Sequence, residues 1–126
     1  MIATNDFPAV FAAQTRIMRP FSDKLVCTRD DDSEYYLNTT HIMKNKKPLF
    51  FGAVQIRKNY VAYHLMPVYV FPELLKGMSP ALKQRMQGKS CFNFTSVDVE
   101  LFEELGTLTK AGFEAYKNAG YIGEHS

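Results

Sequence analysis

The sequence predicts a two-layer α+β domain: a mainly antiparallel five-stranded sheet with an N-terminal helix, short middle helices and a long C-terminal helix. Two observations predict this class. Apolar residues recur at helical spacing near both ends of the chain, and short strand-like runs separated by turns lie between them. Connections this short force neighbouring strands to pair antiparallel. The length of 126 residues fits a single domain, 1–126.

The first predicted helix covers residues 6 to 20. Asp6 is a suitable N-cap, Pro8 lies in the first turn, where proline costs least, and Pro20 should end the helix. A mostly apolar stripe recurs along it at helical spacing, formed by Phe7, Val10, Phe11, Gln14, Ile17, Met18 and Phe21. Such a stripe needs a covering surface, so we expect this helix to lie on the sheet.

Five short runs are predicted as strands, at residues 24–29, 35–40, 49–56, 60–66 and 91–94. The strongest hairpin signal joins the third run to the fourth, because two apolar runs flank a short polar turn. The turn-rich acidic stretch after the first run and the lysine-rich loop after the second separate the remaining strands.

Helical signals return after Pro67. A helical turn is expected at 71–75, and Ser79 can cap a second short helix. The most secure element is the long helix from about 98 to 119, which Gly120 should end. We expect its cap to be one of the two hydroxyl residues just before it, Thr95 or Ser96.

Charge and cysteine usage limit the partners. Fifteen basic against 13 acidic residues give a net charge of only +2, so we predict neither a nucleic-acid nor a membrane partner. No apolar run approaches the roughly 20 residues of a membrane helix, and the N-terminus lacks the pattern of a signal peptide. Cys27 and Cys91 have no metal or redox spacing, which is typical of reduced thiols in a cytoplasmic protein.

The central hairpin is apolar on both sides, whereas a two-layer domain usually leaves one sheet face polar. In strict alternation, Phe50, Val54 and Ile56 share one face of the third strand. Leu49, Phe51 and Ala53 share the other. Three explanations stay open: helices and loops wrap around the second face, another subunit covers it, or a ligand pocket lies there.

A small aromatic-lined ligand pocket is predicted beside His64, which lies in an apolar strand; the alternative is a structural histidine. The candidate ligand-binding residues are Tyr60, Tyr63, His64, Lys89 and Phe92. An enzyme using Cys91 or His64 is a weaker alternative, because no third orienting group is evident. The Gly-Lys-Ser run at 88–90 resembles the end of a phosphate-binding loop, but it lacks the first glycine and leads into a strand.

The densest acidic cluster is the only candidate metal site, and it comprises Asp30, Asp31, Asp32 and Glu34. Such carboxylates could bind iron or another hard cation, although acidic hairpin turns are usually just solvated. The three histidines, His41, His64 and His125, show no metal-ligand spacing. We therefore predict no cofactor, with iron as the alternative.

From Lys47 onward the sequence resembles the YdhG-like domain-of-unknown-function family (number 1801). The resemblance rests on the run from Lys58 to Tyr69, on Ser79-Pro80, and on the stretch from Met86 to Phe94 with its Gly-Lys-Ser-Cys-Phe-Asn-Phe motif. It continues through 103–122. It implies a compact α+β domain with no established activity, and some members are described as frataxin-like iron chaperones.

Together these observations predict a small cytoplasmic, non-enzymatic binding or interaction domain. It could form a homodimer through its sheet and carry a small aromatic-lined pocket. The alternatives are a frataxin-like iron-binding chaperone using the acidic cluster, and an enzyme using Cys91 or His64.

Overall fold

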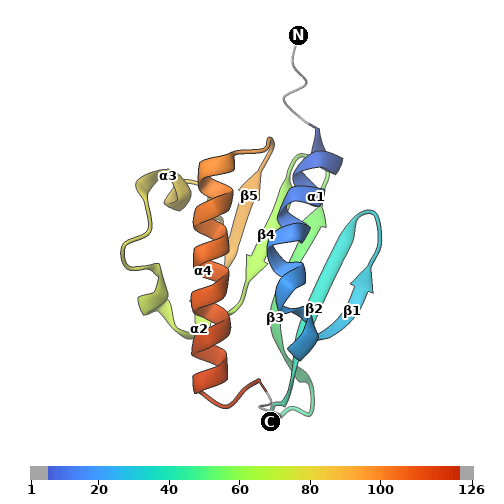
Figure 1. The fold of residues 1–126 in the computed structure, drawn as a ribbon, viewed down its shortest axis with the longest axis vertical. Helices are drawn as coiled ribbons and strands as arrows, with labels where there is room; N and C mark the ends of the chain where they lie inside the picture. The colour runs from blue at the N-terminus through green and yellow to red at the C-terminus, as the bar shows by residue number, and fades with distance from the viewer. Residues whose placement is uncertain (1–5, 123–126) are drawn as a thin grey trace.

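The computed structural model describes residues 6–122 and shows one five-stranded sheet with two long helices packed against it (Figure 1). The sheet has the order β1-β2-β3-β4-β5, and every neighbouring pair is antiparallel. Its strands are β1 (Val26–Asp30), β2 (Glu34–Ile42), β3 (Pro48–Ile56), β4 (Val61–Leu65) and β5 (Cys91–Phe94). The predicted fold class is confirmed.

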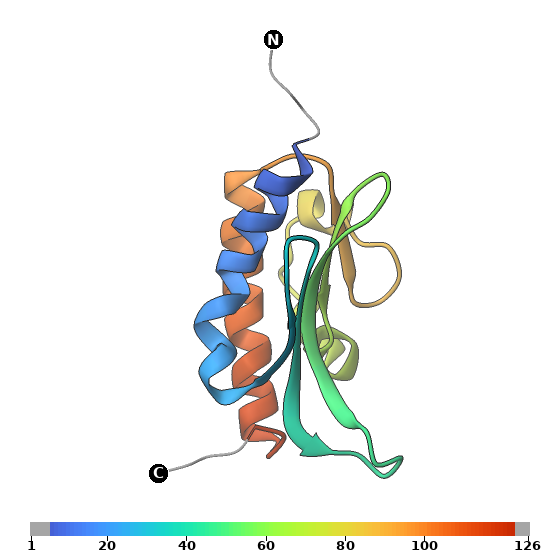
Figure 2. The same ribbon diagram turned by 90° about the vertical axis from the view of Figure 1, so that its right-hand side faces the viewer.

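Both long helices, α1 (Phe7–Met18) and α4 (Val99–Asn118), lie on the same side of the sheet (Figure 2). The core fills the space between the two layers. There Phe51 makes edge-to-face contacts with Phe113 and Tyr116 of α4, with ring centroids 6.1 and 5.9 Å apart. The stripe of apolar side chains on each helix therefore finds the covering surface that the sequence requires.

The ends of α1 follow from local chemistry. The Asp6 carboxylate accepts a hydrogen bond from the backbone N–H of Ala9 at 3.2 Å and caps the first turn, as predicted. After Met18 the chain tightens into the 3₁₀ helix η1 (Arg19–Lys24), which begins with Arg19 and Pro20. Proline cannot donate the next helical hydrogen bond, so the α-helix ends there.

Three short helices connect β4 to β5: α2 (Pro67–Val70), η2 (Pro72–Leu75) and α3 (Pro80–Lys83). Ser79 caps α3 as predicted, its hydroxyl accepting from the N–H of Leu82 at 3.1 Å. The same hydroxyl and the backbone N–H of Ser79 donate to the two carboxylate oxygens of Glu104 at 2.6 and 2.8 Å. This carboxylate fastens the connection to α4.

Both ends of α4 are closed by hydrogen bonds. Asp98 is its N-cap, with the carboxylate accepting from the N–H of Leu101 at 3.1 Å. The helix begins where it is predicted, but the expectation that Thr95 or Ser96 caps it is wrong, because the cap is Asp98, two or three residues further along. Gly120 ends it as predicted, with a φ of 86° that suits glycine.

A β-bulge divides β3 into two parts. The pairing of β2 with β3 shifts register beside Leu37, so Leu37 lies opposite Gly52 while the next residue lies opposite Phe50. Phe51 is the extra residue, so Phe51 and Gly52 both meet the helix layer, and Phe50 points to the opposite face. Strict alternation placed Phe50 on the face of Val54, and this expectation is wrong because it ignored the bulge.

Candidate functional site

The pairing register assigns each strand residue to one face of the sheet. Val54 lies opposite Tyr35 on β2 and Tyr63 on β4. Tyr63 forms a hydrogen bond with Thr109 of α4, so this row faces the helices. The strand residues that alternate with this row point to the opposite side of the sheet, and we call that surface the open face. It comprises Val26, Arg29, Glu34, Tyr36, Asn38, Phe50, Ala53, Gln55, Ala62, His64, Cys91 and Asn93.

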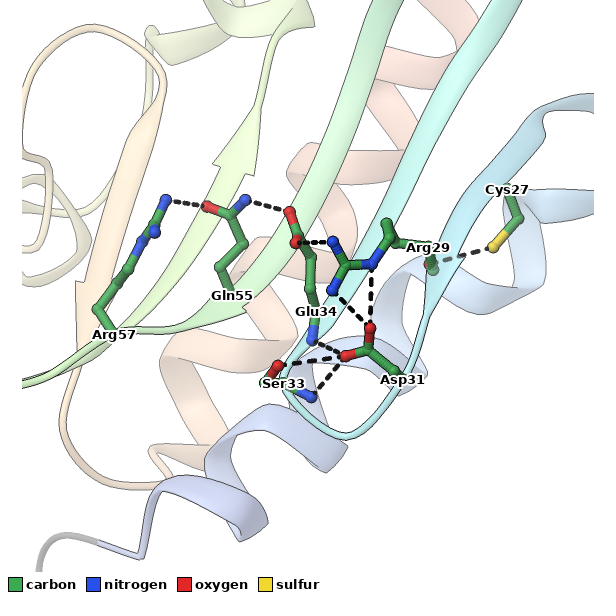
Figure 3. Close-up of polar contacts among 7 residues, drawn as sticks. All are labelled: Cys27, Arg29, Asp31, Ser33, Glu34, Gln55 and Arg57. Atoms are coloured by element: carbon green, nitrogen blue, oxygen red, sulfur yellow. Dashed lines mark hydrogen bonds and ion pairs between the residues drawn. The ribbon is translucent and has the colours of Figure 1, made fainter.

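A continuous chain of polar side chains crosses one end of the open face (Figure 3). We call it the polar ladder, and it comprises Asp31, Arg29, Glu34, Gln55 and Arg57. The Arg29 guanidinium joins the Asp31 carboxylate at 2.7 Å and the Glu34 carboxylate at 3.2 Å. Glu34 accepts from the side-chain amide of Gln55, whose oxygen accepts from Arg57 at 2.7 Å. These contacts link β1, β2, β3 and the turn after β3.

Asp31 anchors the ladder in the β1–β2 turn. Its carboxylate accepts hydrogen bonds from the backbone N–H and hydroxyl of Ser33 at 2.9 and 3.2 Å, and from the N–H of Glu34 at 2.9 Å. These backbone hydrogen bonds, together with Arg29, lower the pKa of Asp31 to about 2. The carboxylate therefore stays ionised at any physiological pH, and the turn keeps its negative charge.

The ladder fixes the protonation of His64. A carboxylate only accepts and a guanidinium only donates, so Gln55 turns its amide nitrogen to Glu34 and its oxygen to Arg57. The same oxygen lies 3.0 Å from Nε2 of His64, which must therefore carry the hydrogen. Burial lowers the pKa of His64 and Arg57 lowers it further, against the smaller raising effect of Glu34, so at pH 7 the ring is a neutral donor at Nε2.

Cys91 lies beside this histidine without being activated by it. Its Sγ is 4.0 Å from Nε2 of His64, which is already a donor, and the thiol donates to Oδ1 of Asn93 at 3.2 Å. Burial raises the pKa of the Cys91 thiol. A nucleophilic cysteine needs a base or a lowered pKa, and this arrangement supplies neither.

Aromatic and apolar side chains occupy the middle of the open face. The rings of Tyr36 and Phe50 are stacked, with centroids 4.7 Å apart, and Phe50 lies 6.5 Å from the ring of His64. Val26, on the neighbouring edge strand, leaves 43% of its surface exposed. The open face thus combines an apolar centre with the polar ladder at one end.

The five predicted pocket residues do not come together. Tyr63 and Phe92 lie opposite each other on β4 and β5, fully buried on the helix side. His64 follows Tyr63 directly, so it points to the other face. Tyr60 belongs to the β3–β4 turn, where its carbonyl accepts from the N–H of Arg57, and Lys89 extends over the ring of Tyr69 at 5.9 Å.

The acidic cluster is divided among arginines. Asp30 pairs with Arg19 at 3.1 Å, whereas Asp31 and Glu34 both pair with Arg29. Within residues 6–122 no three His, Cys, Asp or Glu side chains are grouped so that they could hold a metal ion, and His125 lies outside the described residues. Iron binding by the acidic cluster therefore stays a prediction, and the described residues contain no preformed group of ligands that supports it.

No protein-family model, curated protein or solved structure matches this chain. The resemblance to the YdhG-like family accordingly stays a prediction. Across the described residues, no helix combines the length and the apolar character needed to cross a membrane.

Proposed function

We propose that the protein is a non-enzymatic interaction domain that binds a second copy of itself through the open face of its sheet. The observation that carries the proposal is the charge pattern of that face. Arg29, Asp31 and Glu34 combine one positive with two negative charges at the β1–β2 turn. Arg57, on the other side of the ladder, forms no ion pair within residues 6–122.

This pattern is self-complementary. The β1–β2 and β3–β4 turns lie at the same end of an antiparallel meander. In the proposed dimer, a two-fold axis runs parallel to the strands and lies above the β2–β3 pair. It sets the two open faces against each other and reverses the order in which the strands of the second copy cross the sheet. Arg57 of one copy then lies over the acidic turn of the other, twice in one symmetric interface. Tyr36 and Phe50 lie on β2 and β3, near this axis, and Val26 lies on the neighbouring edge strand; together they supply the apolar contact.

The size of the face predicts how tight such a dimer is. Five strands about 4.8 Å apart and about five residues long, at roughly 3.3 Å a residue, present a projected area of ~400 Å². Stable complexes bury about 800 Å² on each partner. We therefore expect weak, reversible association in the range of tens to hundreds of micromolar.

Sedimentation equilibrium from ~10 µM to ~1 mM protein tests the proposal, because these concentrations span the dissociation constants expected for an interface of this size. The average mass should rise toward that of a dimer, and it should rise less at high salt because the pairing of surface charges is screened. The substitution R57E places a negative charge opposite the acidic turn, and we expect it to keep the chain monomeric throughout.

The matched control is K110E, which makes the same charge change at an exposed position of α4, on the opposite side of the sheet from the open face. It should dimerise like the parent chain. A parent chain that stays monomeric up to 1 mM overturns the proposal, and so does an equal effect of the two substitutions.

The two cysteines of the described chain, Cys27 and Cys91, are both free. This supports a reducing compartment, and we place the domain in the cytoplasm on that ground. Membership of the YdhG-like family is proposed on the sequence motifs alone.

A further inference from the structure

A second surface feature lies away from the open face, in the connection between β4 and β5. There α2, η2 and the loop after α3 enclose a groove of about 800 Å³. Its walls are mostly apolar, formed by Val68, Val70, Pro72, Leu75 and Met86, with Tyr69, Gly88 and Lys89 completing the lining. The volume lies within the range of small-molecule sites, and so does an apolar lining with a few polar groups.

The groove is lined by residues that carry donors suited to an anion and unpaired within residues 6–122. Lys89 forms no ion pair within residues 6–122, and its ammonium lies over the ring of Tyr69, 5.9 Å from the ring centroid. The backbone N–H groups of Gly88 and Lys89 donate to no other group of the described chain. No carboxylate lines the groove to compete for these donors.

The charge of the surrounding segment points the same way. Residues 72–90 carry four basic side chains, Lys76, Lys83, Arg85 and Lys89, against the single acid Glu73. The whole chain carries a net charge of only +2, so this connection, at +3, is more basic than the rest of the protein together. A negatively charged ligand is therefore attracted to this part of the surface.

We infer that this groove binds an apolar organic acid, with the hydrocarbon or aromatic body on the Val68–Leu75 wall and the carboxylate at Lys89. The ammonium and the two free N–H groups supply charge-assisted hydrogen bonds to the carboxylate. Tyr69, which is 53% exposed, lines the groove next to Lys89. The site is independent of the open face and of the self-association proposed for it.

Titration of the full chain with decanoate, followed by ¹H–¹⁵N NMR, tests this inference. Decyltrimethylammonium, which has the same chain and the opposite charge, is the comparison ligand, and both are used below their micelle concentrations. We expect decanoate to shift the amides of 68–75 and 86–89 and to bind about tenfold more tightly than the cation, the effect of one charge-assisted contact.

Two variants locate the carboxylate. K89Q should weaken decanoate binding about tenfold, since it removes one charged hydrogen bond, and it should not weaken binding of the cation. K83Q removes the same charge from α3, outside the groove, and should bind decanoate like the parent chain.

A third variant, L75E, places a carboxylate on the apolar wall and should abolish decanoate binding while the NMR spectrum stays that of a folded chain. Equal affinity for the two ligands, shifts that map elsewhere, or equal losses in K89Q and K83Q would each overturn the inference.

Discussion

The two faces of the sheet are built on opposite principles, and the neighbours Phe50 and Phe51 show the difference most directly. Phe51 is fully buried against Phe113 and Tyr116, in a layer held together by ring contacts. Phe50 lies half-buried on the open face, stacked on Tyr36 next to a chain of hydrogen-bonded polar groups. The covered face therefore carries the stability of the fold, and the open face carries the groups that are available to a partner.

The largest expected effect breaks the covered face. We expect F51A to lower the free energy of unfolding by about 3–5 kcal/mol, because it removes a fully buried ring and leaves a cavity. F50A removes the same ring one residue earlier, on the open face, and should cost less than half as much. Urea unfolding at pH 7 measures both. Equal losses would contradict the assignment of these two rings to opposite faces.

The next effect concerns Gly52, where Met18 of α1 lies close to the backbone of β3. A Cβ on Gly52 would lie 2.6 Å from Cε of Met18 and 2.8 Å from the carbonyl oxygen of His64, and the latter belongs to the backbone of β4. We expect G52A to destabilise the fold by about 1–3 kcal/mol through overpacking. G106A, on α4, has its nearest atom at 3.9 Å and should be neutral or stabilising by about 0.5–1 kcal/mol. Thermal melts of both variants compare the two positions.

The covered side holds a buried side-chain amide without a hydrogen-bond partner among the described residues. Gln14 of α1 is fully buried, and neither its amide oxygen nor its amide nitrogen has a hydrogen-bond partner within residues 6–122. Q14M, nearly the same in shape, removes the desolvated amide and should stabilise the fold by about 1–2 kcal/mol. Denaturant titration would show this as a higher midpoint with an unchanged slope; a loss of stability would mean that the amide has a partner in solution.

The smallest effect tests the open face through pH. Burial holds the pKa of His64 below its ordinary value near 6.5, so the unfolded chain binds the proton first as the pH falls. The stability that the neutral ring contributes is complete above pH ~6.5 and is lost below it, toward the lower pKa of the folded state. Urea unfolding at several pH values between about 7.5 and 5 should show the free energy of unfolding falling as the pH falls. H64Q should reduce this pH dependence, whereas H41Q should leave the contribution of His64 in place.

Local signals in the sequence predicted much of the fold. Asp6, the Ser79-Pro80 pair and Gly120 each stand where the backbone needs a cap, a helix start or a left-handed residue, and each can be read from its immediate neighbours. The bulge at Phe51 could not be read in this way, because it depends on how β2 and β3 align. Because the prediction assumed strict alternation without a bulge, it assigned Phe50 to the wrong face.

The candidate site was less predictable for the same reason. Glu34 and Gln55 lie 21 residues apart, and only the register of β2 on β3 brings them together. Alternation along β4 was sufficient to separate Tyr63 from His64, yet the predicted pocket combined them because it grouped residues by type. The one available signal for the polar ladder was the polar residues Glu34 and Gln55 within otherwise apolar or aromatic strands.

The order of the strands has a consequence for how the chain folds. Each strand pairs only with its neighbour in sequence, so the sheet requires short loops to close and can form step by step as the chain is synthesised. Helix α4, by contrast, follows all five strands and packs beside α1, the first element. Until α4 has left the ribosome, part of the apolar side of the sheet and one flank of α1 remain exposed, so this interval is when the nascent chain most needs protection from aggregation.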